Sequence, residues 1–441
     1  MDFRLRRQRA MLGLRGGAGV ATRVETAEGQ AAAPTGFGAY LFAHAAWFLA
    51  FGVQMVLFPY LVRVVLQENE IRLGIAQMCQ SLPTTLLILL GGFIADRADG
   101  KRIVVLACLV STAVFLGLAG LVSAGRLTYG LLIVYALTVG VIGAFATPAR
   151  DALLSHVAPV EGGVQRAVSG AFMAQFAGQI LGMVAAIMAP LVGVAALLFG
   201  QAGLLLAAGV AALRMRPRLR ETRAPQAGHP LRYLGSEIAD GFRAAVASPI
   251  IGPVVLCSAG MGVCFMGAFA VLLPLVVQGY FPAVVAGRDN TAIASALGVF
   301  TLCFWVGSML AAIVLMRAGP PKRKGLVYLT ALGSGAIVLG LCAIPMPFWA
   351  LCALNVAWGV AGGVTMTLGR GLVQEHAPPD KRARVLSIFT LGMMGGGPLG
   401  AVAYGVLAHE IGPRMAILFP SILMGMIVAA VAARSRLRTL G

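Results

Sequence analysis

The sequence predicts an all-α membrane protein with twelve transmembrane helices in two six-helix, pseudo-symmetric bundles. Composition, the spacing of apolar segments and an internal repeat support this fold class. Of the 441 residues, 59% are hydrophobic and only 11% are charged, whereas soluble domains carry about 25% charged residues. The composition therefore excludes a water-soluble globular enzyme and an ordinary disordered chain.

Twelve apolar segments approach the length of about 20 residues that a helix needs to cross a bilayer, and charged or Gly/Pro-rich joints separate them. The expected helices of the first bundle span residues 40–65, 73–95, 103–124, 128–147, 167–189 and 191–213. Those of the second bundle span residues 250–279, 291–316, 326–345, 349–369, 385–408 and 415–433. Only the region around Pro190 divides the fifth helix from the sixth.

The helices define five regions: a basic N-terminal tail, an N-terminal bundle, a linker, a C-terminal bundle and a basic C-terminal tail. In that order they occupy residues 1–38, 39–213, 214–249, 250–433 and 434–441. The N-terminal tail has no apolar core and is not a secretory signal, which leaves a basic tail near anionic lipid or an organellar transit peptide. The linker carries apolar residues three or four apart, which predicts an amphipathic helix along the membrane surface: Leu231, Leu234, Ile238, Phe242 and Val246.

The net charge of +18 lies in the joints between apolar segments. With both termini cytoplasmic, all Lys and Arg residues fall in inside segments except Arg63, Arg72, Arg126, Arg288 and Arg414. This asymmetry follows the positive-inside rule, so we expect a multi-pass inner-membrane protein with no Lys or Arg at a membrane centre. Since loop charge sets orientation here, no nucleic-acid partner is expected.

The two halves of the sequence echo each other. Arg166-x-x-Ser169 is followed by Gly178 and Gly182, and Arg384-x-x-Ser387 is followed by Gly396 and Gly400, at a constant offset of 218 residues. Glycines four apart let helices approach closely, so similar packing alone is one explanation and an internal repeat is the other. Two repeated halves suit alternating access around a site near the midplane.

A distinctive run joins the second and third expected helices: Gly91-Gly92-Phe93-Ile94-Ala95-Asp96-Arg97-Ala98-Asp99-Gly100-Lys101-Arg102. A carboxylate at the membrane rim can cap the positive N-terminus of a facing helix or pair with a neighbouring Arg. Such contacts hold in one conformation and break in another.

This run resembles the signature loop of the major facilitator superfamily, G-x-x-x-D-R followed by basic residues, and the helix count, basic linker and repeat extend the resemblance over nearly the whole chain. Three features resemble the superfamily's drug- and siderophore-exporter branch of enterobactin exporters and macrolide efflux proteins: Asp96-Arg97-x-Asp99, Thr147-Pro148-Ala149-Arg150 and Asp240-Gly241-Phe242-Arg243. Gly100 departs from this branch, which usually has Arg there.

The resemblance implies a conformational latch at the cytoplasmic rim. Asp96 would hold the N-terminus of the eleventh helix and Arg150 in the outward-facing state, and Gly92 would allow close packing. The implied latch residues are Gly92, Asp96, Arg97, Asp99, Lys101, Arg102 and Arg150.

The expected membrane interior is almost uncharged. No carboxylate is placed at the midplane, which argues against proton antiport through a buried acid and against cationic substrates. His44 is the one histidine expected within a span. It is either a buried histidine donating to a carbonyl or a group that couples transport to protons.

In the superfamily, the first, fourth, seventh and tenth helices line the cavity. We therefore take as cavity candidates His44, Gln54, Tyr60, Tyr135, Met261, Phe265, Met266, Asn355 and Trp358. Met and aromatic surfaces adapt to varied apolar ligands, although each of these residues could instead serve helix packing.

The sequence thus predicts a secondary active transporter, not an enzyme, which exports a small amphipathic or apolar molecule resembling a drug or siderophore. An importer or lipid-type facilitator of the same superfamily and a transport-inactive sensor are the alternatives. The expected partners are the substrate and the bilayer, with a monomer as the expected state and proton coupling left open. None of the seven cysteines forms a CxxC pair, and no metal or cofactor is expected.

Overall fold

The computed structural model describes residues 36–95, 98–158, 163–216, 242–280, 291–319, 321–378 and 382–439. Most of the expected N-terminal tail and most of the linker lie outside these ranges, as do Asp96 and Arg97 of the implied latch. Of the expected amphipathic helix, Phe242 and Val246 are described and are mostly exposed.

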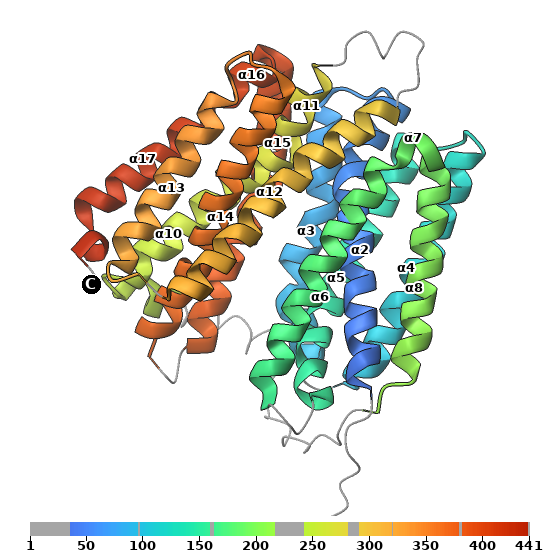
Figure 1. Cartoon of the computed structure of the whole chain (residues 1–441), viewed down its shortest axis with the longest axis horizontal. Coiled ribbons are helices and arrows are strands. Elements are labelled where there is room, and N and C mark those ends of the chain that lie inside the picture. The colour runs from blue at the N-terminus through green and yellow to red at the C-terminus, as the bar shows by residue number, and fades with distance from the viewer. Residues whose placement is uncertain are drawn as a thin grey trace, which may run out of the picture.

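The N-terminal half consists of helices that run up and down in turn (Figure 1). They are α2 (Phe37–Tyr60) with the π-helical turn η1 (Leu61–Val65), α3 (Glu70–Ala95), α4 (Gly100–Ser123), α5 (Tyr129–Val157), α6 (Gly163–Ile187), the short α7 (Ala189–Val192) and α8 (Val194–Leu213). Local signals set several ends. Asp99 and Thr128 cap α4 and α5 by accepting backbone N–H groups, and Gly193 (φ 86°) separates α7 from α8.

The C-terminal half repeats this plan. Its first span, which we call the seventh span, is interrupted. It consists of α10 (Ile251–Met261), the π-helical turns η2 (Gly262–Met266) and η3 (Ala268–Leu272), and α11 (Leu273–Gln278). The remaining elements are α12 (Thr291–Ala318), α13 (Lys324–Leu341), α14 (Phe348–His376), α15 (Arg382–Ile411), α16 (Pro413–Ala416), α17 (Leu418–Arg434) and the 3-10 turn η5 (Arg436–Thr439).

The predicted fold class is confirmed. Eleven helical segments of the described chain are long and apolar enough to cross a membrane. The twelfth, α3, is 26 residues long and packs between α5 of its own half and α15 of the other.

Two helices extend further than their apolar stretches. We expected the fourth and tenth helices to end near residues 147 and 369, but α5 continues to Val157 and α14 to His376. Arg150 and Arg370 therefore lie within helices rather than in joints. The prediction was wrong because a charged residue ends a hydropathy segment without ending the helix, and Arg is a good helix former.

The internal repeat appears as matched helix pairs. The pairs α2–α6, α3–α5 and α4–α8 of the first half correspond to the pairing of the seventh span with α15, α12 with α14 and α13 with α17. The repeat glycines lie at equivalent contacts. Gly178 and Gly182 of α6 abut backbone atoms of α2, and Gly396 and Gly400 of α15 abut backbone atoms of the seventh span.

Replacing Gly182 with valine should destabilise the protein. A Cβ there would collide with the carbonyl oxygen of Leu49, and overpacking of this kind costs about 1–3 kcal/mol. Thermal unfolding in detergent measures the loss. Gly203→Val is the matched control, because a Cβ at Gly203 meets no atom within 4 Å; equal melting temperatures for the two variants would contradict the packing argument.

We name the end of the molecule where α2 begins the inner end and the opposite end the outer end, after the orientation that the loop charges predict. In Figure 1 the two halves converge at the outer end, at the top, and diverge toward the inner end. The contacts between them agree: side-chain bonds join Arg63 to Gln278 and Glu70 to His409 at the outer end. The innermost hydrogen bond between the halves that we describe is the one that the Thr85 hydroxyl donates to the Met394 carbonyl, near the middle of α3.

Candidate functional site

The strongest candidate for a ligand site is an apolar hollow in the C-terminal half. Its empty space is about 300 Å³. We call it the aromatic pocket, and it is lined by Met261, Phe265, Met266, Phe269, Phe304, Trp358, Gly362 and Met366. These residues come from the seventh span, α12 and α14, and none of them is charged or carries a carboxylate, amide or hydroxyl group.

The rings of the aromatic pocket form one connected cluster. The Trp358 ring lies 5.5 Å from that of Phe265, 6.0 Å from Phe269 and 5.3 Å from Phe304, measured between centroids. Most of these contacts are edge-on or tilted, which is the favourable geometry for aromatic pairs. Trp305, next to Phe304, extends the cluster across the molecule to Phe176 of the N-terminal half, 6.1 Å away.

The seventh span positions half of the aromatic pocket. Phe265 and Met266 lie in the π-helical turn η2, and Phe269 lies in η3. Each π turn widens the helix by one residue and is frequent at functional sites. Glycines make this possible, since Gly262 and Gly267 abut the α15 backbone where a side chain would collide.

Four of the nine cavity candidates line the aromatic pocket: Met261, Phe265, Met266 and Trp358. Sequence reasoning missed Phe269, Phe304, Gly362 and Met366. Phe269 follows Phe265 by four residues and Met366 follows Trp358 by eight, so helical spacing alone could have found both. Phe304 was missed because it lies on the eighth helix, which the superfamily expectation left out.

The other candidates lie elsewhere. The Gln54 side chain donates to Gln201 Oε1, and Gln201 donates to the Ala50 carbonyl, which ties α8 to α2. Asn355 donates to the Phe300 carbonyl at 2.6 Å and ties α14 to α12. Both amides are buried and serve helix packing.

Three aromatic or imidazole candidates of the first half are also away from the aromatic pocket. Tyr135 is buried against Phe58 and Phe115 within that half. Tyr60 lines a smaller hollow at the outer end. His44 is buried near the inner end, where its Nδ1 lies 3.5 Å from the Tyr40 hydroxyl and its ring contacts Phe48.

An Asn355→Leu variant separates packing from ligand binding. Loss of the bond to Phe300 should lower stability by about 0.6–2 kcal/mol and leave substrate affinity within about twofold. Thermal unfolding and equilibrium binding measure the two effects. Thr367→Val is the control, because its hydroxyl bonds within α14 itself; weaker binding at unchanged stability would place Asn355 in the ligand site instead.

The implied latch is only partly visible. Asp99 accepts the Lys101 backbone N–H and lies 3.4 Å from Arg102 Nε, so it caps its own helix. Gly92 does not make the expected close contact, because no atom lies within 4 Å of the place of its Cβ. Its neighbour Gly91 does so instead, against the Ala144 carbonyl, since the two glycines face different sides of α3.

Arg150 is buried beneath aromatic rings of α2. Its guanidinium carbon lies 4.5 Å from the Trp47 ring centroid and 5.1 Å from that of Phe48, a cation–π arrangement. The Tyr40 hydroxyl donates to its carbonyl at 3.2 Å. Its Nη1 has no hydrogen-bond partner, which leaves this donor available when the inner end rearranges.

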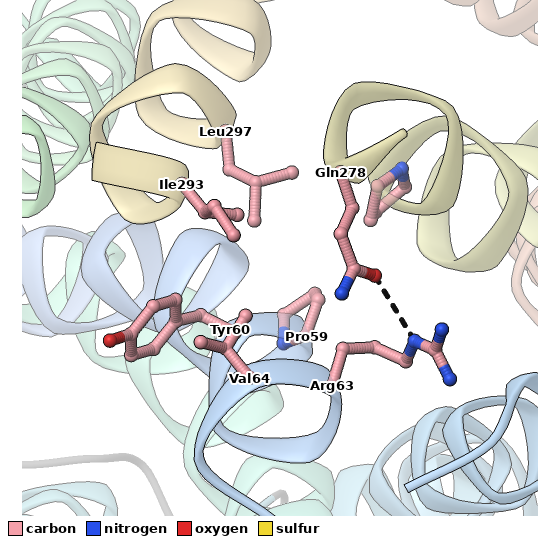
Figure 2. A pocket seen from close by; sticks show the side chains of 8 residues that line it. Pro59, Tyr60, Arg63, Val64, Gln278, Ile293 and Leu297 are labelled. Atoms are coloured by element: carbon pink, nitrogen blue, oxygen red, sulfur yellow. Dashed lines mark hydrogen bonds between the residues drawn. The ribbon is translucent and has the colours of Figure 1, made fainter. Parts of the chain in front are cut away.

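The outer end holds a polar cluster that joins the halves. Arg63 Nη2 lies 2.7 Å from Glu70 Oε1, and Arg63 Nε donates to Gln278 Oε1 at 3.1 Å (Figure 2). His409 Nδ1 lies 3.3 Å from Glu70 Oε2. Together with the glycine contact described next, these four side chains form what we call the outer seal.

Beside this cluster, Gly74 of α3 and Gly405 of α15 meet without side chains. A Cβ on Gly405 would lie 2.8 Å from the Glu70 carbonyl oxygen and 3.2 Å from Gly74 Cα. On the other side of the interface, Ser295 of α12 donates to the Ile187 carbonyl at 2.6 Å. Close contacts therefore close the outer end on both sides of the molecule.

The fold and site define a membrane transporter of the twelve-helix class. A model of the Major Facilitator Superfamily matches residues 39–287 and 280–439. The chain belongs to this superfamily.

Among its curated relatives, the enterobactin exporter EntS of Salmonella typhi is 24% identical over 331 residues, which cover 74% of each chain. EntS of Escherichia coli O81 (strain ED1a) is 24% identical over 332 residues with the same coverage. Solved structures share the fold at lower identity. The nucleoside transporter NupG has a TM-score of 0.71 at 14% identity, covering 91% of this chain and 99% of its own. The peptide transporter POT has a TM-score of 0.69 at 14% identity, covering 92% of this chain and 96% of its own.

Proposed function

We propose that the protein exports a small apolar or amphipathic molecule, drug- or siderophore-like, across the inner membrane by alternating access, with both termini in the cytoplasm. Similarity to enterobactin exporters supports export. Loop charge supports the orientation, because it favours a cytoplasmic inner end. The substrate would enter from the inner end, toward which the halves diverge in the present conformation (Figure 1).

The aromatic pocket is the observation that carries the substrate class. Its lining consists of aromatic rings, thioethers and one glycine, and pockets lined in this way bind apolar and aromatic groups. Met261, Met266 and Met366 surround the rings, and thioethers adapt to varied apolar shapes. An anion would lose its hydration there without gaining a partner, and a cation would meet rings but no carboxylate. Both arguments favour a neutral aromatic moiety as the part that binds.

Transport would then require the two ends to open in turn. Opening of the outer end breaks the outer seal, and closure of the inner end brings α15 toward the loop that contains Asp96. A carboxylate there would stabilise the positive N-terminus of α15. The latch would thus favour the conformation opposite to the present one.

Flux in proteoliposomes tests the proposal directly. Purified protein should move neutral aromatic dyes or drugs, and expression in an efflux-deficient host should lower their accumulation. Asp96→Asn should reduce both effects while the protein remains folded, because the latch loses its charge. Asp2→Asn, in the N-terminal tail, is a matched control that should transport normally.

The same assay addresses the rival functions. Accumulation that rises on expression would indicate an importer, and movement of labelled phospholipid between leaflets would indicate a lipid facilitator. A folded protein that binds ligands but produces no flux across a broad panel would indicate a sensor. Each of these results would overturn the export proposal.

A further inference from the structure

The outer seal contains one histidine side chain. Histidine is the residue whose ordinary titration falls between pH 5 and 8, and His409 is 45% exposed at the outer end of α15. Its partner Glu70 begins α3 of the other half, where its carboxylate is 22% exposed. The pair therefore joins the two halves and remains accessible to protons from the outer solution.

Glu70 is held in place by its own half. One carboxylate oxygen pairs with Arg63 at 2.7 Å, and the other faces His409. Arg63 also donates to Gln278 of the C-terminal half, so one link across the interface is insensitive to pH and the other is not. Protonation of His409 converts the contact between a neutral imidazole and the Glu70 carboxylate into an ion pair. This strengthens the outer seal without moving either side chain.

Apart from Arg63, which shares the Glu70 carboxylate, the basic side chains nearby contact other groups. Glu68 is occupied by Arg72, whose Nη1 lies 2.7 Å from it, and Arg72 also stacks on Tyr129 of α5. The Arg414 guanidinium, next to α15, lies over the Tyr280 ring. Glu410, the next residue, is exposed, and adjacent side chains of a helix do not face each other.

We propose that the Glu70–His409 pair is an external pH sensor, which holds the outer end closed when the outer solution is acidic. Acid outside thus retains the carrier in the conformation that loads from the inner end and slows its opening to the outside. The pair takes up and returns protons on the same side of the membrane, so it regulates transport without coupling it to proton movement. This inference rests on the proposed function for its physiological meaning, but the conformational response stands independently.

Distances across the outer end test the sensor without any transport assay. Spin labels on a genetically encoded keto amino acid at Ala124 and Ile344, exposed residues at the outer ends of α4 and α13, leave the native cysteines in place. Double electron–electron resonance between pH 5.5 and 7.5 should show the ratio of closed to open molecules rising about two- to fivefold in acid, the range of a partly exposed ion pair. These conditions stay above pH 4.3, where free glutamate titrates.

Three variants separate the sensor from general effects of acid. His409→Gln should remove the pH response and leave the distances as in neutral solution, and His409→Lys should keep the outer end closed at both pH values. Glu70→Gln should also abolish the response. Glu410→Gln, the adjacent control, should keep it.

A pH response that survives in His409→Gln, or its absence in the unchanged protein, would overturn the inference. Neither result affects the export proposal. Conversely, absence of flux with an intact distance response would remove the proposed function and leave the sensor.

Discussion

A Trp358→Ala variant is expected to bind a neutral aromatic substrate at least about 30-fold more weakly than the unchanged protein. Trp358 contacts three other rings of the aromatic pocket, and truncation of such a central aromatic side chain costs about 2 kcal/mol or more. Equilibrium binding of a fluorescent aromatic drug to purified protein measures the loss.

The same helix provides a matched control for this variant. Trp349 lies at the start of α14 and is 73% exposed, so Trp349→Ala should leave binding unchanged. Trp358→Phe retains a ring and should recover most of the affinity. Equal binding by the two alanine variants would show that the substrate is held elsewhere.

A Gly405→Leu variant is expected to force the outer end open. A side chain there must displace the Glu70 carbonyl and Gly74, and overpacking by about 1–3 kcal/mol shifts a two-state equilibrium about tenfold or more. Hydrogen exchange in the peptide that covers residues 70–80 should accelerate by about that factor, and export should fall because the carrier no longer loads from the inner end.

Local wedging must be distinguished from unfolding. Exchange in α4 and α8, which lie away from the interface between the halves, should remain as in the unchanged protein. Gly425→Leu is the control, since no atom lies within 4 Å of a Cβ at Gly425. Unchanged exchange over residues 70–80 in Gly405→Leu would contradict the role of the glycine contact in closing the outer end.

Much of the fold was predictable because hydropathy and loop charge act over long segments. The division around Pro190 separates α6 from α8 as expected, and the glycines at the 218-residue offset lie at equivalent helix contacts. The ends of α5 and α14 were less predictable. Helix formation tolerates Arg150 and Arg370, and the rings of Trp47 and Phe48 accommodate the Arg150 guanidinium.

The lining of the aromatic pocket was harder to predict than the fold. A membrane helix that is apolar on every side gives no periodic signal for the face that meets a ligand. Neighbouring residues of the seventh span, such as Cys264 and Phe265, differ little in hydropathy, yet only Phe265 lines the aromatic pocket. The polar candidates Gln54 and Asn355 attracted attention as ligand groups, but an amide in a membrane bonds to the next helix when one lies within reach.

The two π-helical turns of the seventh span have a consequence for how this protein could diverge. Each accommodates one residue beyond the regular helix, so loss of a single residue between Gly262 and Leu272 would straighten one turn. Every position beyond it would then rotate about the helix axis by about 100°. A neighbouring residue would take the place of Phe269 in the lining of the aromatic pocket. A single insertion or deletion here would therefore change the lining of the pocket, and with it the substrate preference, in one step.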